Sequence, residues 1–153
     1  MKDYLVAFAA GVLLLAGSAS AQEKKIKRSD LPPAVEKTVA VQSAGATIRG
    51  FSTEKENGQT LYEVEMTVSG HNKDVSMTAD GSIVEVEEQV PLDSLSPEVK
   101  AAFEAKAGDG RILKVESLTK KGRLVAYEAK VETNGKKTEI QVGPDGKPLD
   151  HPE

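Results

Sequence analysis

The stretch that decides the fold is Tyr62–Gly70, which reads YEVEMTVSG. Its apolar residues alternate with glutamate and threonine, and alternation of this kind predicts a strand with one apolar and one polar face. Such a strand is typical of an antiparallel sheet that is covered on one side only. The Ser69-Gly70 pair at its end predicts a tight turn into a following strand.

The same pattern returns 65 residues later in Tyr127–Gly135, which reads YEAKVETNG. Further upstream the two stretches match at an offset of 64, where Leu31 and Pro33 correspond to Leu95 and Pro97. The change of offset falls in a loop, where an inserted residue is easily tolerated. The sequence therefore predicts a tandem duplication.

Each copy is expected to begin with a short amphipathic helix. In the second copy Ser96 is a suitable N-cap and Pro97 suits the first helical position. Glycine turns then separate the strands, and Pro148 argues against a fourth strand in the second copy. We predict an α+β fold of two tandem units, each one helix on a three- to four-stranded antiparallel sheet. The first unit (31–90) has the order α-β-β-β-β, and the second (91–153) has the order α-β-β-β.

Residues 1–21 are predicted to be a signal peptide. An apolar run from Leu5 to Ala16 is followed by Ala19-Ser20-Ala21, the small-residue pattern that signal peptidase accepts. The alternative, an uncleaved anchor, would need a run of roughly 20 apolar residues. Residues 22–30 read as a charged flexible lead. The expected location is periplasmic or secreted, with no membrane span after cleavage.

Charge is distributed unevenly along the chain. The formal net charge of −4 argues against a nucleic-acid partner, because phosphate binding needs a concentrated basic face. Ten acidic and four basic residues give the segment 31–90 a charge of −6, whereas 91–153 carry eleven of each. The two copies therefore need not do the same job.

Three short motifs carry a resemblance to a known family. The motifs in the first copy are Leu31–Val35 (LPPAV), Tyr62–Val64 (YEV) and Asp80–Ile83 (DGSI), and the second copy repeats them in similar form. Together they resemble the PepSY and PepSY-like group. The resemblance implies a secreted or periplasmic binding module of a group in which restraint of proteases is suspected. It also implies a likeness to β-lactamase inhibitor proteins, which have two helix-and-sheet units.

No residue pattern points to an enzyme or to a bound cofactor. The sequence has no cysteine, His71 falls in a predicted turn, and His151 lies just before the final Pro152-Glu153 pair. No nucleophile is accompanied by a base in a pattern that would activate it. We therefore expect a non-enzymatic protein.

The polar face of the predicted sheets is the most available binding surface. A protein or peptide of the cell envelope is the expected partner. The sequence has no tryptophan, so aromatic anchors are scarce, and Phe51 is the one aromatic residue assigned neither to the core nor to the signal peptide. The predicted partner-binding residues are Glu63, Glu65, Thr67, Ser76, Thr78, Phe51 and Lys130.

A second hypothesis is an acidic, cation-responsive protein of the calcium type, or a sensor or scaffold module. Glu85, Glu87 and Glu88 crowd the strand that ends the first copy and are the candidate ligands. The competing interpretation is that these charges keep an edge strand soluble and unpaired.

Overall fold

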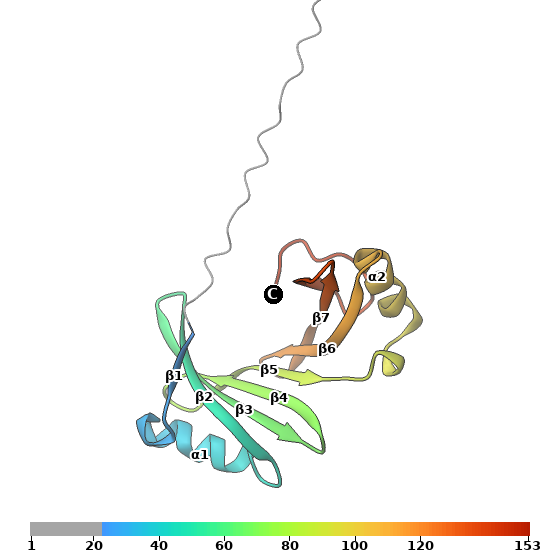
Figure 1. Cartoon of the computed structure of the whole chain (residues 1–153). Helices are drawn as coiled ribbons and strands as arrows, with labels where there is room; N and C mark the ends of the chain where they lie inside the picture. The colour runs from blue at the N-terminus through green and yellow to red at the C-terminus, as the bar shows by residue number, and fades with distance from the viewer. Residues whose placement is uncertain (1–22) are drawn as a thin grey trace, which may run out of the picture.

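The computed structural model describes residues 23–153, and the predicted signal peptide lies outside them. All the strands belong to one antiparallel sheet, in which each strand pairs with its neighbour in sequence (Figure 1). The strands are β1 (Lys24–Ile26), β2 (Thr47–Glu56), β3 (Gln59–Val68), β4 (His71–Met77), β5 (Ile83–Gln89), β6 (Arg111–Lys120), β7 (Arg123–Thr133) and β8 (Lys136–Val142). The helices are α1 (Pro33–Gln42) and α2 (Pro97–Ala107), preceded by the short 3-10 turns η1 (Arg28–Asp30) and η2 (Leu92–Ser94).

The prediction of two tandem units, each with its own sheet, is wrong. Strand β5 pairs with β6 from Glu85↔Lys120 to Gln89↔Glu116, so one eight-stranded sheet runs through both repeats. Two separate sheets would leave the outer edges of β5 and β6 with unpaired backbone groups. Pairing these edges satisfies those groups, and the local sequence pattern of either repeat does not reveal it.

The flexible lead also needs correction. Residues Lys24–Ile26 form β1 and pair with β2, where Ile26 lies opposite Phe51. Ile26 packs against the first core, and this burial favours an ordered strand over a free lead.

Both helices cover the same face of the sheet. Val35 and Val39 of α1 pack on the first half of the sheet, and Val99 and Phe103 of α2 pack on the second half. The sheet curves away from the helices, and its opposite face is therefore concave (Figure 1). This concave face is the surface on which polar side chains gather.

Local predictions about turns and caps are confirmed. Gly58 and Gly122 have positive φ in equivalent hairpin turns. Ser96 caps α2 by accepting a hydrogen bond from the Val99 amide, and Pro97 is the first helical residue. These features depend on neighbours in sequence, which is why sequence reasoning finds them.

Candidate functional site: the concave face of the sheet

The register of the strands determines which side chains share the concave face. Glu63 lies opposite Ser52 on one side and Ser76 on the other, and Ser76 lies opposite Glu85. Glu85 in turn lies opposite Lys120 in the second repeat. One line of polar side chains thus crosses both repeats. The concave face consists of Lys25, Ser52, Leu61, Glu63, Glu65, Asp74, Ser76, Glu85, Glu87, Glu116, Leu118, Lys120, Ala126, Glu128, Lys130, Glu139 and Gln141.

Three carboxylates meet at the centre of this face. Oxygen atoms of Asp74, Glu87 and Glu116 all lie within 4.8 Å of one another. Arg49 donates a hydrogen bond from Nη2 to Asp74 Oδ1 at 2.7 Å, and Lys114 Nζ lies 2.6 Å from Glu116 Oε1. Two members of the group are therefore neutralised by cations of the same chain.

Besides Glu128, which accepts a hydrogen bond from Gln141, Glu63 and Glu87 are the carboxylates of this face that lack a cation within residues 23–153. Both are half-buried, and neither forms an ion pair with any residue of the described part, 23–153. Burial, together with repulsion from neighbouring carboxylates, raises the pKa of Glu63 to about 7 and that of Glu87 to about 8. A cation from outside would relieve this desolvation and repulsion.

Most of the surrounding carboxylates are already paired with a cation. Glu65 lies 3.4 Å from Arg49 and Glu85 lies 3.5 Å from Lys120. Glu139 lies 3.0 Å from Lys130. Unsatisfied negative charge is therefore concentrated at Glu63 and Glu87, near the middle of the sheet.

The structure brings together most of the predicted binding residues. Glu63, Glu65, Ser76 and Lys130 share the concave face, although Ser76 is only 8% exposed. Thr67 extends the same face toward the end of β3, opposite Asn72. The remaining two predicted residues lie elsewhere.

Thr78 follows β4 and hydrogen-bonds within the turn, to Asp80 and Ser82, rather than presenting its hydroxyl on the sheet. Phe51 is buried on the helix side, 9% exposed, so its prediction as an exposed anchor is wrong. A bulge between Ile48 and Gly50 shifts the alternation of β2 by one residue and turns Phe51 inward. The predicted correspondence at the offset of 64 held a signal for this, because it matches Phe51 with Val115, which is also buried.

The three glutamates proposed as cation ligands do not form one cluster. Glu85 and Glu87 share the concave face, but Glu88 points to the other side, opposite Lys73, because side chains alternate along β5. Glu87 instead joins Asp74 and Glu116. Sequence reasoning missed Asp74 and Glu116 because they come from other strands, one of them in the second repeat.

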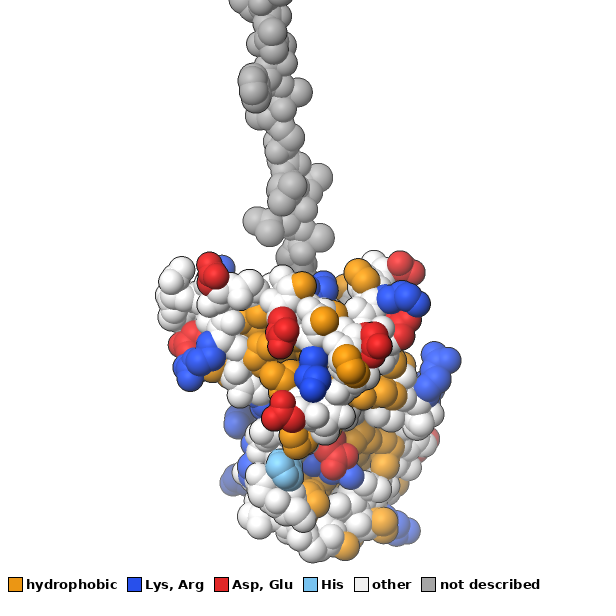
Figure 2. Space-filling model, turned by 90° about the vertical axis from the view of Figure 1, so that its right-hand side faces the viewer, with side chains coloured by type: hydrophobic (Ala, Val, Ile, Leu, Met, Phe, Trp, Pro, Cys, Tyr) orange, Lys and Arg blue, Asp and Glu red, His pale blue; other side chains and the backbone are white. Residues whose placement is uncertain are grey.

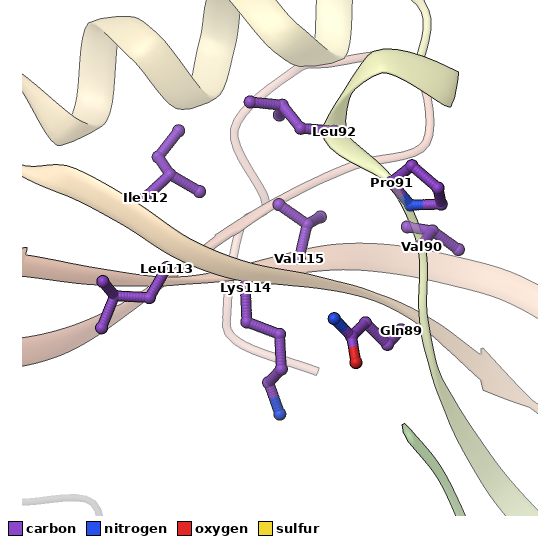
Figure 3. Close-up of a pocket in the computed structure, with 8 residues that line it drawn as sticks. All are labelled: Gln89, Val90, Pro91, Leu92, Ile112, Leu113, Lys114 and Val115. Atoms are coloured by element: carbon purple, nitrogen blue, oxygen red, sulfur yellow. The ribbon is translucent and has the colours of Figure 1, made fainter. Parts of the chain in front are cut away.

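Two hollows border the face. A cavity of about 220 Å³ lies at one end, lined by Leu61, Glu85, Lys120 and others. A second, of about 180 Å³, lies beside the turn into η2 and includes Leu113, which a bulge in β6 leaves 36% exposed (Figure 3). On the side that carries α2, acidic and basic side chains are interspersed among apolar ones (Figure 2). That side therefore shows no patch of charge of a single sign.

Comparison with known proteins identifies the fold. A candidate periplasmic protein from Bacteroides eggerthii matches with a TM-score of 0.63 and 20% identity over 76% of this chain and 84% of that chain. A DUF2874 family protein from Bacteroides ovatus matches with a TM-score of 0.61 and 22% identity over 78% and 85%. A BLIP-like protein from Bacteroides fragilis matches with a TM-score of 0.54 and 21% identity over 77% and 82%.

These likenesses show that the chain has the fold of DUF2874 and BLIP-like proteins. No protein-family model matches the sequence, and neither does any curated protein. The PepSY relationship remains a prediction. None of the three structures is named as an enzyme, and the predicted periplasmic or secreted location agrees with the name of the first. Within residues 23–153, no helix combines the length and the apolar character that crossing a membrane requires.

Proposed function

We propose that this protein is an exported, non-enzymatic binding protein of the periplasm, and that its concave face binds a basic segment of an envelope protein. The observation that carries the proposal is the pair of half-buried, unpaired carboxylates, Glu63 and Glu87, at the middle of a curved sheet. A lysine or arginine side chain placed beside either carboxylate would form charge-assisted hydrogen bonds with it. The fold of BLIP-like proteins supports a binding role, and restraint of a protease is one form that it could take.

Binding of a basic segment should depend on pH. The pKa of Glu63 is about 7 and that of Glu87 about 8, so both carboxyls are largely protonated at pH 6. A cationic ligand stabilises the ionised forms, and binding near neutral pH should therefore release protons. We expect affinity to rise from pH 6 to pH 8.5.

The test uses a decalysine peptide and a pull-down from envelope extract. We expect the double variant Glu63→Gln/Glu87→Gln to bind decalysine about tenfold more weakly at pH 8.5, because it loses two favourable charge interactions. The control Glu98→Gln/Glu104→Gln removes the same charge from exposed sites on α2. Equal weakening by both pairs would show that only net charge matters and would refute the proposed site.

A divalent cation at Asp74, Glu87 and Glu116 is the second candidate function. The convergence of three carboxylate oxygens within 4.8 Å favours it, whereas the ion pairs with Arg49 and Lys114 weigh against it. Calorimetry with calcium and magnesium tests it. An absence of heat and of any change in melting temperature would eliminate this function.

A further inference from the structure

The segment that follows β8 is anchored on the helix side of the sheet. Its Asp145-Gly146 turn packs on α2 so closely that a Cβ added to Gly146 would stand 2.6 Å from the carbonyl oxygen of Glu98. Beyond the turn, Leu149 and Pro152 line a cavity of about 250 Å³ with Lys106, Ile140 and Gln141. The segment therefore passes around the outer edge of β8.

The end of the segment lies on the concave face. The main-chain N–H of Glu153 donates a hydrogen bond of 2.9 Å to Gln141 Oε1 in β8, and Glu153 Oε2 lies 3.8 Å from Lys120 Nζ in β6. Because β7 lies between these two strands, Glu153 reaches across β7. Figure 1 shows the end of the chain inside the curve of the sheet, on the side away from α2.

The polar partners of this segment also contact other residues. Lys120 lies between Glu153 and Glu85, at 3.8 and 3.5 Å, and Gln141 also donates a hydrogen bond to Glu128 at 2.9 Å. Partly exposed ion pairs of this kind are individually weak. Packing of the Gly146 turn on α2 and of Leu149 beside β8 keeps the segment close to the face.

We propose that the segment Leu149–Glu153 is an internal competitor of the partner. It occupies the concave face at Lys120 and Gln141, and a basic partner that spans the sheet must displace it. This inference rests on the proposed function of the face. The eight strands cover roughly 34 Å at roughly 4.8 Å for each gap, and a ten-residue extended peptide is about as long. Decalysine can therefore reach both Glu87 and the end that the segment occupies.

The first experiment examines the segment without a partner. Leu149→Ser removes an apolar contact without changing charge, and Glu153→Gln removes the ion pair with Lys120. Asp150→Asn is the matched control, because Asp150 is exposed and forms no hydrogen bond or ion pair with residues 23–153. We expect NMR shifts of the Gln141 side-chain amide and of β7 amides to change in both test variants and to stay constant in the control. Unchanged shifts in the test variants would overturn the inference.

The second experiment measures decalysine binding by the full chain at pH 8.5. If the segment leaves the face free for about a tenth of the time, Leu149→Ser should raise affinity by up to about tenfold. Asp150→Asn should not raise it. Binding that depends on Glu87 but is unaffected by Leu149→Ser would overturn the inference and leave the proposed function standing. Binding that is insensitive to both Glu63 and Glu87 would count against the proposed function itself.

Discussion

Asp74 in β4 and Glu87 in β5 lie directly opposite each other on the concave face, as register partners of adjacent strands. Two carboxylates in that position repel each other. Arg49 lies 2.7 Å from Asp74, and Glu87 forms no ion pair with any residue from 23 to 153. Repulsion between these carboxylates therefore lowers the stability of the folded protein at the centre of the sheet.

Replacing Glu87 with Gln should stabilise the protein at high pH. The pKa of Glu87 is about 8 in the folded state and roughly 4.3 when unfolded, so the folded state prefers the protonated form. Its ionisation costs stability progressively as the pH rises from about 4 to about 8. After allowance for solvent screening, we expect a gain of about 1 to 3 kcal/mol at pH 8.5 and almost none at pH 4, measured by urea unfolding. Glu104→Gln on α2 is the control, and equal gains would contradict the prediction.

Replacing Arg49 with Gln should destabilise the protein. Burial raises the pKa of Asp74, and the Arg49 guanidinium, which also lies 3.4 Å from Glu65, opposes part of that rise. Its loss leaves both carboxylates without their arginine, at a cost of about 1 to 3 kcal/mol at pH 8. The destabilisation caused by Arg49→Gln should become smaller as the pH falls, because Asp74 becomes increasingly protonated. Arg111→Gln is the control, because its ion pair with Glu132 involves an arginine side chain that is 75% exposed. Similar effects of the two variants would argue against a special role for Arg49.

Gly81 should tolerate alanine much less well than Gly58 does. Both have φ close to +80°, which costs an L-residue about 1 to 2 kcal/mol. At Gly81 the added Cβ would also stand 2.6 Å from the carbonyl oxygen of Ala34 in α1, whereas at Gly58 it would meet open space. In thermal unfolding, the free energy of unfolding of Gly81→Ala should be at least about 1 kcal/mol lower than that of Gly58→Ala. Equal stabilities would show that α1 can shift away from the turn.

The two cores should unfold together although each lies under its own helix. Tyr62 packs against the first core and Tyr127 against the second, so the fluorescence of each tyrosine reports on one half. Phe103→Ala in the second core should cost about 3 to 5 kcal/mol. Because β5 and β6 join the halves, we expect both signals to shift to lower denaturant together, as read in Tyr62→Phe and Tyr127→Phe backgrounds. An early transition at Tyr127 alone would mean that the halves are independent.

Local features of the sequence were sufficient to predict much of the concave face. The alternation along Tyr62–Gly70 placed Glu63 and Glu65 on one polar face, and the turn glycines and the Ser96 cap were assigned correctly. Each of these depends on residues only a few positions apart, and the same pattern in the second copy reinforced it. The bulge before Phe51 was the exception, because a single extra residue reverses the face on which every later side chain lies.

The sequence by itself predicted the helices, the hairpins and the polar character of one sheet face. Only the tertiary structure decided that β5 pairs with β6, that Glu87 meets Asp74 and Glu116, and that Glu153 returns to Lys120. The physical reason is that alternation and turn chemistry act between near neighbours in the chain. The pairing of two strand edges depends instead on which edge remains free once the hairpins have formed, and residues distant in sequence meet only through that pairing.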